Sequence, residues 1–388
     1  MKYSRNQINK AGDILLSAKD QEEYNRATDM INDWRSLHLP VLEELHNSLV
    51  SILKKEHIQI HSVSQRLKRL SSIKNKLVRN LDMKLGGLQD IGGLRIVFPT
   101  MDVLNRAYNI LEKNIPENFE LTKDPVNYIL KPKDSGYRCI HFIYKYKSEK
   151  QELDGTKVEL QIRTKLQHSW AMAVETAELV TETALKSSEG DVKWLDFFKF
   201  VSSLFALKEK TPILEEHVKS GYVTAKSLIF QIYNQDRDKH FVDTLRVLNI
   251  TIRHSQNENH KNGYYILNIN YEREIVKITA FSKDKEKKAT HEYSVLEKQI
   301  EKKNHAVVLV SVPKIQEIQD AYPSYFLDNK IFINIIDKEF KKNFGDLNDK
   351  TFKTFVSAIY PDSDNQYINN EKEFFDLVKQ YETKGAIK

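Results

Sequence analysis

Four short polar blocks in the first half of the sequence carry side chains that could bind phosphate groups and a metal ion. The first block contains Arg66, Lys68, Ser72 and Lys76. On a helix, positions 68, 72 and 76 would lie on one face at intervals of four residues. Two ammonium groups with a hydroxyl between them suit a row of phosphates. A solvated basic helix face is the alternative, and for an isolated run of charges it is the commoner one.

The second block, residues 90–95, places Asp90 and Arg95 on either side of two adjacent glycines. A carboxylate just before a strand can hold Mg²⁺, which prefers oxygen ligands and usually takes only one or two of them from the protein. The glycines would let a ligand or a neighbouring backbone approach closely. On these residues alone, an aspartate that caps a turn is the alternative interpretation.

The third block contains Lys133, Gly136, Tyr137 and His141. An exposed tyrosine beside a glycine could stack on a nucleobase, because every base has an aromatic face. The nearby cations could then meet phosphate. A glycine turn that leads into a strand would produce the same pattern, so both interpretations stay open.

The fourth block contains Glu159, Gln161 and Arg163, which would share one face of a strand. The same alternation fits the wet face of an antiparallel sheet. Taken together, the four blocks favour a catalytic site over these separate alternatives. Two acids, Asp90 and Glu159, that converge on Mg²⁺ beside phosphate-binding cations suit phosphoryl or nucleotidyl transfer.

Strands that alternate with helices must position these blocks. β-branched and aromatic runs predict strands at 94–98, 139–146 and 158–162. Apolar residues at helical spacing predict helices near the N-terminus, after Pro40, after Asp102, from Lys165 onward, and over 194–206 and 213–233. We therefore expect an α+β fold in which a mixed sheet is flanked by helices.

Polar stretches at 234–238 and 254–262 predict a boundary between two domains. We expect a first domain over 1–235, a linker over 236–260 and a smaller α+β domain over 261–388. Alternating runs in the second domain predict a hairpin at 264–271 and 274–281, a helix at 290–303 and a strand at 306–312.

Composition excludes several classes of protein. Hydrophobic residues make up 40% of the 388 residues, which excludes a wholly disordered chain. The single cysteine, Cys139, excludes a disulfide framework and a cysteine zinc site. Neither a signal peptide nor a membrane-spanning stretch is visible, so we expect a cytoplasmic protein that does not enter a membrane. A net charge of +6 allows an anionic partner without requiring one.

The four blocks, read in order, resemble the synthetase domain of the RelA/SpoT family over roughly residues 40–210. The matching segments are RLKRLSSIKNK at 66–76, DIGGLR at 90–95, NYILKPKDSGYRCIH at 127–141 and ELQIRT at 159–164. The resemblance implies a nucleotidyltransferase-like mixed sheet. It also implies transfer of the β,γ-pyrophosphate of ATP to a ribose 3′-hydroxyl, with release of AMP.

The resemblance also implies a role for each site residue. Asp90 and Glu159 would be catalytic and would hold Mg²⁺, with Glu159 alternatively helping to deprotonate the hydroxyl. ATP would be bound by Arg66, Lys68, Ser72, Lys76 and Arg95. The acceptor would be bound by Lys133, Tyr137, His141, Gln161 and Arg163.

Departures from the family pattern gather around the acceptor pocket. Asn127, Ser135 and Cys139 stand where the family more often has an aspartate, an asparagine and a small hydroxyl residue. These departures leave two candidates for the acceptor. It would be the 3′ CCA end of tRNA or, alternatively, GDP, GTP or an adenine nucleotide in a (p)ppGpp or (p)ppApp synthetase.

The second domain resembles the antitoxin of fused toxin–antitoxin synthetases, the CapRel group. In that group a tyrosine pair covers the adenine site until a phage structural protein binds and releases the toxin. The resemblance makes Tyr322 and Tyr325 the inhibitory pair here, although two aromatics near a helix end are more often part of a core. It implies an autoinhibited tRNA pyrophosphotransferase in antiviral defence.

A hypothesis from another class is a catalytically inactive module that binds RNA or senses a partner. The retained acids Asp90 and Glu159 argue against it.

Overall fold

The described residues fall into two compact units. The computed structural model describes residues 2–181, 192–239, 241–242, 245, 263–270, 275–299, 305–312 and 329–344. Unit 1 takes in the described residues within Met1–Tyr128, Cys139–His168 and Ile250–Asp328. Unit 2 takes in those within Ile129–Arg138, Ser169–Asn249 and Asn329–Lys388.

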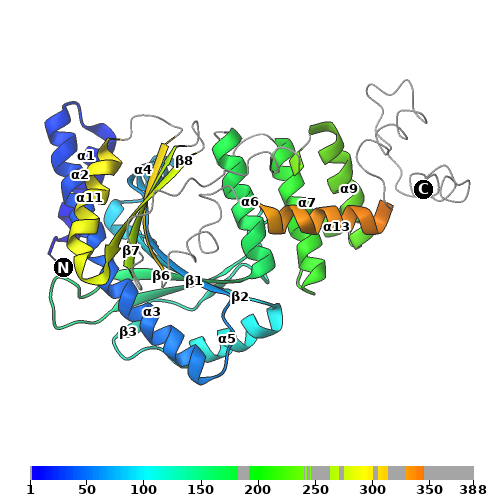
Figure 1. Ribbon diagram of the computed structural model, residues 1–388, viewed down its shortest axis with the longest axis horizontal. Coiled ribbons are helices and arrows are strands. Elements are labelled where there is room, and N and C mark those ends of the chain that lie inside the picture. The colour runs from blue at the N-terminus through cyan, green and yellow to red at the C-terminus, as the bar shows by residue number, and fades with distance from the viewer. Residues whose placement is uncertain are drawn as a thin grey trace, which may run out of the picture. The chain divides into compact units, whose positions relative to one another are not determined.

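Unit 1 is built on one mixed sheet, so the predicted α+β class is confirmed (Figure 1). Its nine described strands follow the order β3-β5-β6-β2-β1-β9-β7-β8, with β4 paired to β5. Strands β2 and β6 run parallel, and the other neighbouring strands pair antiparallel. The strands are β1 (Ser62–Leu67), β2 (Gly92–Phe98), β3 (Phe119–Leu121), β4 (Val126–Asn127), β5 (Ile140–Tyr146), β6 (Lys157–Thr164), β7 (Gly263–Asn270), β8 (Ile275–Ser282) and β9 (His305–Val312).

The helices of unit 1 cover the sheet and one of its ends. Helices α3 and α5 lie together on one side of the sheet, and α1, α2 and α11 lie side by side (Figure 1). The predicted apolar stripe after Pro40 is confirmed, because Val41, Leu42, Leu45, Leu49 and Leu53 are buried. These helices are α1 (Arg5–Ser17), α2 (Gln21–Ser36), α3 (His38–Lys55), α4 (Leu70–Arg79), α5 (Met101–Lys113) and α11 (Glu286–Lys298), with short 3-10 turns η1 (Leu85–Gly87) and η3 (Lys283–Lys285).

Unit 2 is helical in the part that the structure describes. Helix α6 (Lys165–Thr181) begins in unit 1 and continues into unit 2, which also holds α7 (Val192–Lys208), α8 (Glu215–Lys219), α9 (Ala225–Lys239) and α13 (Lys330–Phe344). Aromatic rings of α7 and α13 meet in its core, where Phe198 lies 6.0 Å from Phe332 between ring centroids. The single helix predicted over 213–233 is wrong. Gly221 has a φ of +79°, a left-handed conformation that favours glycine and ends α8.

The described strands of the predicted C-terminal domain extend the sheet of unit 1. The predicted hairpin is β7 and β8, and β9 pairs with β7 on one side and with β1 on the other. The pairs Gln65↔Ser311 and Arg66↔Val310 join the two parts of the chain. Pairing of this kind covers an edge that β1 would otherwise expose. Most of the predicted linker, 236–260, lies outside the described residues, and the predicted boundary stays a prediction.

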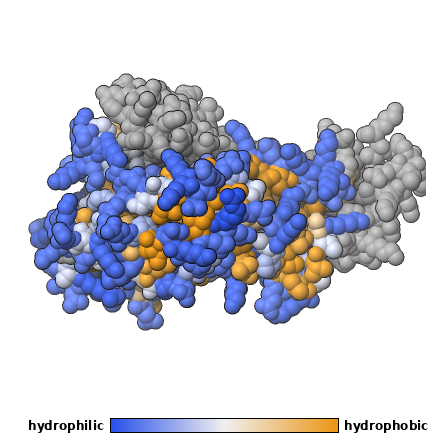
Figure 2. Space-filling view, turned by 90° about the horizontal axis from the view of Figure 1, so that it is seen from below, coloured by the Kyte–Doolittle hydropathy of each residue, from blue (hydrophilic) through white to orange (hydrophobic). Residues whose placement is uncertain are grey.

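The surface is mostly hydrophilic where Figure 2 shows it. On the face seen in Figure 2, hydrophilic residues predominate and apolar residues form smaller groups between them. None of the described helices is both long and apolar enough to cross a membrane.

Candidate active site

Two rows of side chains cross the strands on one face of the unit 1 sheet. Register places Arg66, Gly93 and Glu159 in one row, and Ser64, Arg95, Gln161 and His141 in the next. Residues paired across neighbouring strands point to the same face of a sheet. With Lys68 and Asp90, most members of these rows line a cavity of about 50 Å³. Three of the four predicted blocks, the first, second and fourth, therefore line this cavity.

Asp90 is held between two lysines. Its Oδ2 accepts hydrogen bonds from Lys68 Nζ at 2.8 Å and from Lys76 Nζ at 2.9 Å. Burial opposes the negative charge, but the two ammonium groups lower the pKa of Asp90 to about 2. Its other oxygen, Oδ1, is buried and has no hydrogen-bond partner within the described residues. Asp90 thus offers one ionised oxygen to a cation.

The predicted helix through Lys68, Ser72 and Lys76 is wrong at its beginning. Arg66 belongs to β1, and Lys68 lies between this strand and α4, which begins at Leu70. The Lys68 N–H donates to the Ile91 carbonyl at 2.8 Å, so backbone pairing with the chain before β2 continues past the strand. Ser72 and Lys76 lie on α4 as predicted.

Glu159 is fixed by two partners on its own face of the sheet. Its Oε2 accepts from Gln161 Nε2 at 2.7 Å, and its Oε1 lies 2.8 Å from His141 Nδ1. Burial opposes the charge of Glu159, but His141 keeps the pKa of the carboxyl below its usual range. Burial likewise opposes a charge on His141, whereas Cys139 and Glu159 raise the pKa of the imidazole. The pair is therefore an ionised carboxylate beside an imidazolium.

The two predicted arginines differ in position. Arg95 is 8% exposed, lines the cavity, and has an Nε without a hydrogen-bond partner among the described residues. Arg163 is buried more deeply and its NH2 lies 2.7 Å from His168 Nδ1. The lining of the described cavity includes Arg95 and leaves out Arg163.

Lys133 and Tyr137 belong to unit 2, and the expectation of an exposed tyrosine is wrong. The Tyr137 side chain is 7% exposed, and Lys133 Nζ lies 5.3 Å from the centroid of its ring. The neighbouring Gly136 is clamped to α7, because Ser202 Oγ donates to its carbonyl at 2.6 Å. The acceptor-binding role of both residues stays a prediction. The predicted pair Tyr322 and Tyr325 lies outside the described residues.

Sequence reasoning missed Ser64 and gave Gly93 too little weight. Ser64 stands two residues before Arg66 and shares its face of β1, so the alternation of a strand would have found it. Among the described residues, a Cβ added at Gly93 would meet only the Arg66 carbonyl oxygen within 4 Å, at 3.9 Å. The space above Gly93, between Arg66 and Glu159, is therefore open to a ligand.

Gly93→Val is expected to weaken binding of a non-hydrolysable ATP analogue by about tenfold or more while leaving stability close to wild type, because its side chain enters open space above a strand. Calorimetric titration and thermal unfolding measure the two effects. Gly92→Ala is the matched control. Its Cβ would lie 3.0 Å from His38 Cβ and 3.1 Å from Val158 Cγ1, so stability should fall instead. Unchanged binding by Gly93→Val would show that the ligand does not pass over this residue.

Acid is expected to remove a measurable stabilising contribution of Asp90. Its pKa is lowered from 3.8 to about 2 in the folded chain, so the contribution is complete above pH 3.8 and is lost as pH falls towards 2. The whole contribution is about 2 kcal/mol, of which about 1 kcal/mol is lost by pH 3. Urea unfolding of wild type and Asp90→Asn at pH 6 and pH 3 measures it. A stability difference that does not change between these pH values would contradict the ion pairs.

Comparison with known proteins decides the family. The family described as "Region found in RelA / SpoT proteins" matches residues 65–179. GTP pyrophosphokinase YjbM of Bacillus subtilis (strain 168) is 31% identical over 151 residues, which cover 36% of this chain and 69% of that protein. The chain belongs to the RelA/SpoT family.

The plant relatives match a smaller share of their own length. "Probable GTP diphosphokinase RSH3, chloroplastic" of Arabidopsis thaliana is 30% identical over 177 residues, which cover 45% of this chain and 22% of that protein. The chain thus spans about a fifth of the length of the first curated relatives it matches. The solved structure of small alarmone synthetase 1 from Bacillus subtilis covers 50% of this chain and 98% of its own, at 24% identity and a TM-score of 0.40.

Proposed function

We propose that the chain is an ATP-dependent pyrophosphotransferase of the RelA/SpoT type. The observation that carries this proposal is Asp90, whose Oδ2 is held by Lys68 and Lys76 while its Oδ1 stays without a partner in the described part of the chain. Cations and an ionised carboxylate in one cavity match the needs of an ATP triphosphate and its metal. The names of the relatives, GTP pyrophosphokinases, support the same activity.

Asp90 and Glu159 are the residues that would hold Mg²⁺. No group of three or more His, Cys, Asp or Glu that could hold a metal occurs among the described residues. Two carboxylates fit Mg²⁺ nonetheless, since this ion usually takes few protein ligands and completes its shell with water and substrate phosphates. When bound, the ion neutralises charge on the transferred group.

The chain's own residues bind and orient the reactants. Lys68, Lys76 and Arg66 would contact the phosphates, and Arg95 would add positive charge at the base of the cavity. The acceptor 3′-oxygen would attack the β-phosphorus and the bond from that phosphorus to the α,β-bridging oxygen would break, so that AMP leaves with the bonding electrons. Glu159 is the carboxylate that would take the hydroxyl proton.

We propose the 3′ CCA end of tRNA as the acceptor. The net charge of +6 and the departures at Asn127, Ser135 and Cys139 support this choice. The second candidate is an alarmone synthetase that uses GDP, GTP or an adenine nucleotide. The relatives named GTP pyrophosphokinases favour it.

Transfer of label from γ-labelled ATP tests both candidates. The protein is incubated with tRNA, and separately with GDP, GTP, ADP and ATP as acceptors, and products are separated by size. Label on tRNA is the expected result for the tyrosine variant below, in which the proposed cover of the adenine site is removed. Label confined to small nucleotides would overturn the tRNA acceptor and keep the pyrophosphotransferase, whereas no transfer by the wild type or by the tyrosine variant below would overturn both.

The double variant Tyr322→Ala with Tyr325→Ala is expected to make the full-length chain toxic when it is expressed in bacteria, because the proposed cover of the adenine site is lost. The measurement is growth after induction. The same variant carrying Glu159→Gln is the control and should be harmless. Normal growth of cells that express the double variant would contradict autoinhibition by this pair, and with it the proposed release by a phage structural protein in the cytoplasm.

A further inference from the structure

A buried ion pair joins the C-terminal part of unit 1 to its N-terminal helices. Arg35 of α2 donates through NH1 to Glu297 Oε2 of α11 at 2.8 Å, and through NH2 to the Tyr293 hydroxyl at 2.7 Å. The side chains of Arg35 and Glu297 are 1% and 9% exposed. Since a buried charge is costly without its partner, this pair fixes α11 against α2.

The same glutamate also caps α4. Glu297 Oε1 accepts a hydrogen bond from the backbone N–H of Leu70 at 2.9 Å, and Leu70 is the first residue of α4. The residue before it, Arg69, makes no side-chain capping hydrogen bond. The first N–H groups of a helix need outside acceptors, and a negative charge there is favourable. Glu297, 227 positions away in the sequence, therefore supplies the acceptor for the first N–H group of α4.

Helix α4 carries residues of the proposed ATP site. Ser72 lies in its first turn and Lys76 lies further along, with its Nζ 2.9 Å from Asp90 Oδ2. The buried side of α4 packs into an apolar cluster with α1 and α2. The position of Lys76 thus depends on the packing of α4 and on how its first turn is held.

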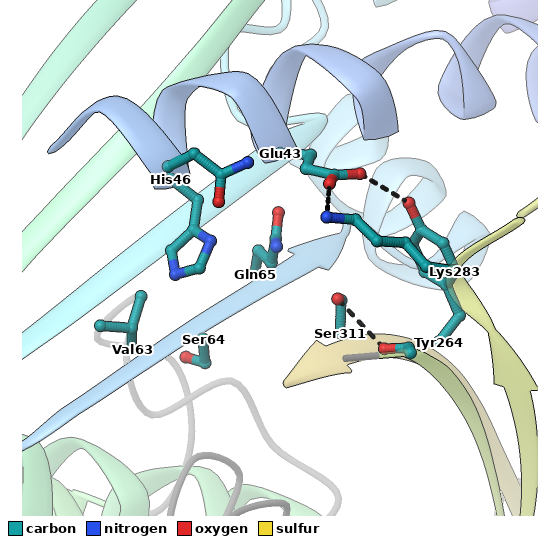
Figure 3. A pocket seen from close by; sticks show the side chains of 10 residues that line it. Glu43, His46, Val63, Ser64, Gln65, Tyr264, Lys283 and Ser311 are labelled. Atoms are coloured by element: carbon teal, nitrogen blue, oxygen red, sulfur yellow. Dashed lines mark hydrogen bonds and ion pairs between the residues drawn. The ribbon is translucent and has the colours of Figure 1, made fainter. Parts of the chain in front are cut away.

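Further contacts keep the C-terminal part of unit 1 in place. Glu43 of α3 lies between Lys283 and the Tyr264 hydroxyl and contacts both (Figure 3). These residues border a cavity of about 100 Å³ where α3, β1 and β7 meet. At the end of α11, Lys298 pairs with Asp29 of α2. Among the described residues this pair makes no hydrogen bond to α4 and does not line the proposed ATP cavity, so it provides a control.

We propose that Glu297 is a positioning residue of the helix that binds the ATP phosphates, so that the segment 263–312 takes part in ATP binding. This inference rests on the proposed function of α4. It assigns to α11 a supporting contribution to the site, separate from any inhibition by residues further along the chain.

Two double variants, each made in the full chain that also carries Tyr322→Ala and Tyr325→Ala so that turnover can be measured, isolate the cap. Arg35→Met with Glu297→Gln removes the buried charges and keeps an oxygen that can accept from Leu70. Arg35→Met with Glu297→Met removes the charges and the acceptor together. Only the second is expected to raise the KM for ATP, by about fivefold, a size typical of losing a helix cap. Its kcat and its KM for the acceptor should match those of the first variant.

Hydrogen exchange supplies a readout that does not depend on catalysis. Amides at the start of α4 should exchange faster in the Glu297→Met double variant than in the Glu297→Gln one, while Lys298→Ala should leave them unchanged. Equal exchange and equal KM for ATP in the two double variants would overturn the positioning role. If exchange differs but the chain released by Tyr322→Ala and Tyr325→Ala binds no ATP analogue, the cap stands and the proposed function of α4 fails.

Discussion

Asp90→Asn is expected to lower the rate of pyrophosphate transfer by roughly a thousandfold, a loss typical of removing a main electrostatic contact to the reacting group. Asparagine keeps the shape of the side chain and loses its charge. Lys68 and Lys76 then lie beside each other without the carboxylate that now holds both of them. The proposed metal loses a ligand at the same time, so the KM for ATP should rise as kcat falls.

Steady-state kinetics with γ-labelled ATP measure the effect of Asp90→Asn in the released tyrosine variant. Asp82→Asn is the matched control, because Asp82 is an exposed acid that lies shortly before Asp90 in the sequence. Its activity should equal that of the parent. An Asp90→Asn protein that keeps more than about a tenth of the activity would rule out the proposed metal site.

Glu159→Gln is expected to lower kcat by about a thousandfold or more and to raise the KM for ATP less than Asp90→Asn does, because Asp90 stays in place between Lys68 and Lys76. Glutamine can still meet Gln161 and His141, so the local structure should hold, but it can neither take a proton nor bind a metal as a carboxylate does. The smaller rise in KM distinguishes it from Asp90→Asn, since Glu159 lies beyond Gly93 from Arg66, the proposed phosphate contact.

The His141 imidazole reports on Glu159→Gln independently of turnover. The carboxylate helps to raise the pKa of His141, so removing its charge should lower that pKa, as followed by NMR titration. Glu152→Gln, at an exposed position before β6, is the control and should leave kcat and the titration unchanged. Full activity of Glu159→Gln would overturn the catalytic role of this carboxylate.

The sequence predicted those elements whose own residues determine them. Strands β2, β5 and β6 are compact apolar runs, and α6 begins at Lys165 as predicted. Strand β1 was missed, because Ser62, Ser64 and Gln65 are polar and do not mark a strand by themselves. Its conformation depends on pairing with β2 on one side and β9 on the other. Such pairing is a tertiary effect that local pattern does not record.

The candidate site likewise has features that the sequence predicted and features that it did not. Asp90, Glu159 and Lys68 were named from residue type and order, and the fold brings them to one cavity. The burial of Tyr137 could not be predicted, because the neighbouring Gly136 is held by Ser202 of α7, which is distant in the sequence. The cap from Glu297 to Leu70 could not be predicted either, since no local signal links residues so far apart.

The place of β9 in the sheet has a consequence for how the protein is made. Strand β1 receives its second neighbour only from residues 305–312, which a ribosome adds long after the four polar blocks. Chains grow at about 5–20 residues per second, so an interval of tens of seconds at the slower rate separates β1 from its partner. During that interval the nascent chain lacks both β9 and the α4 cap. A growing chain would therefore complete its proposed ATP site only after the segment from β7 to β9 has left the ribosome.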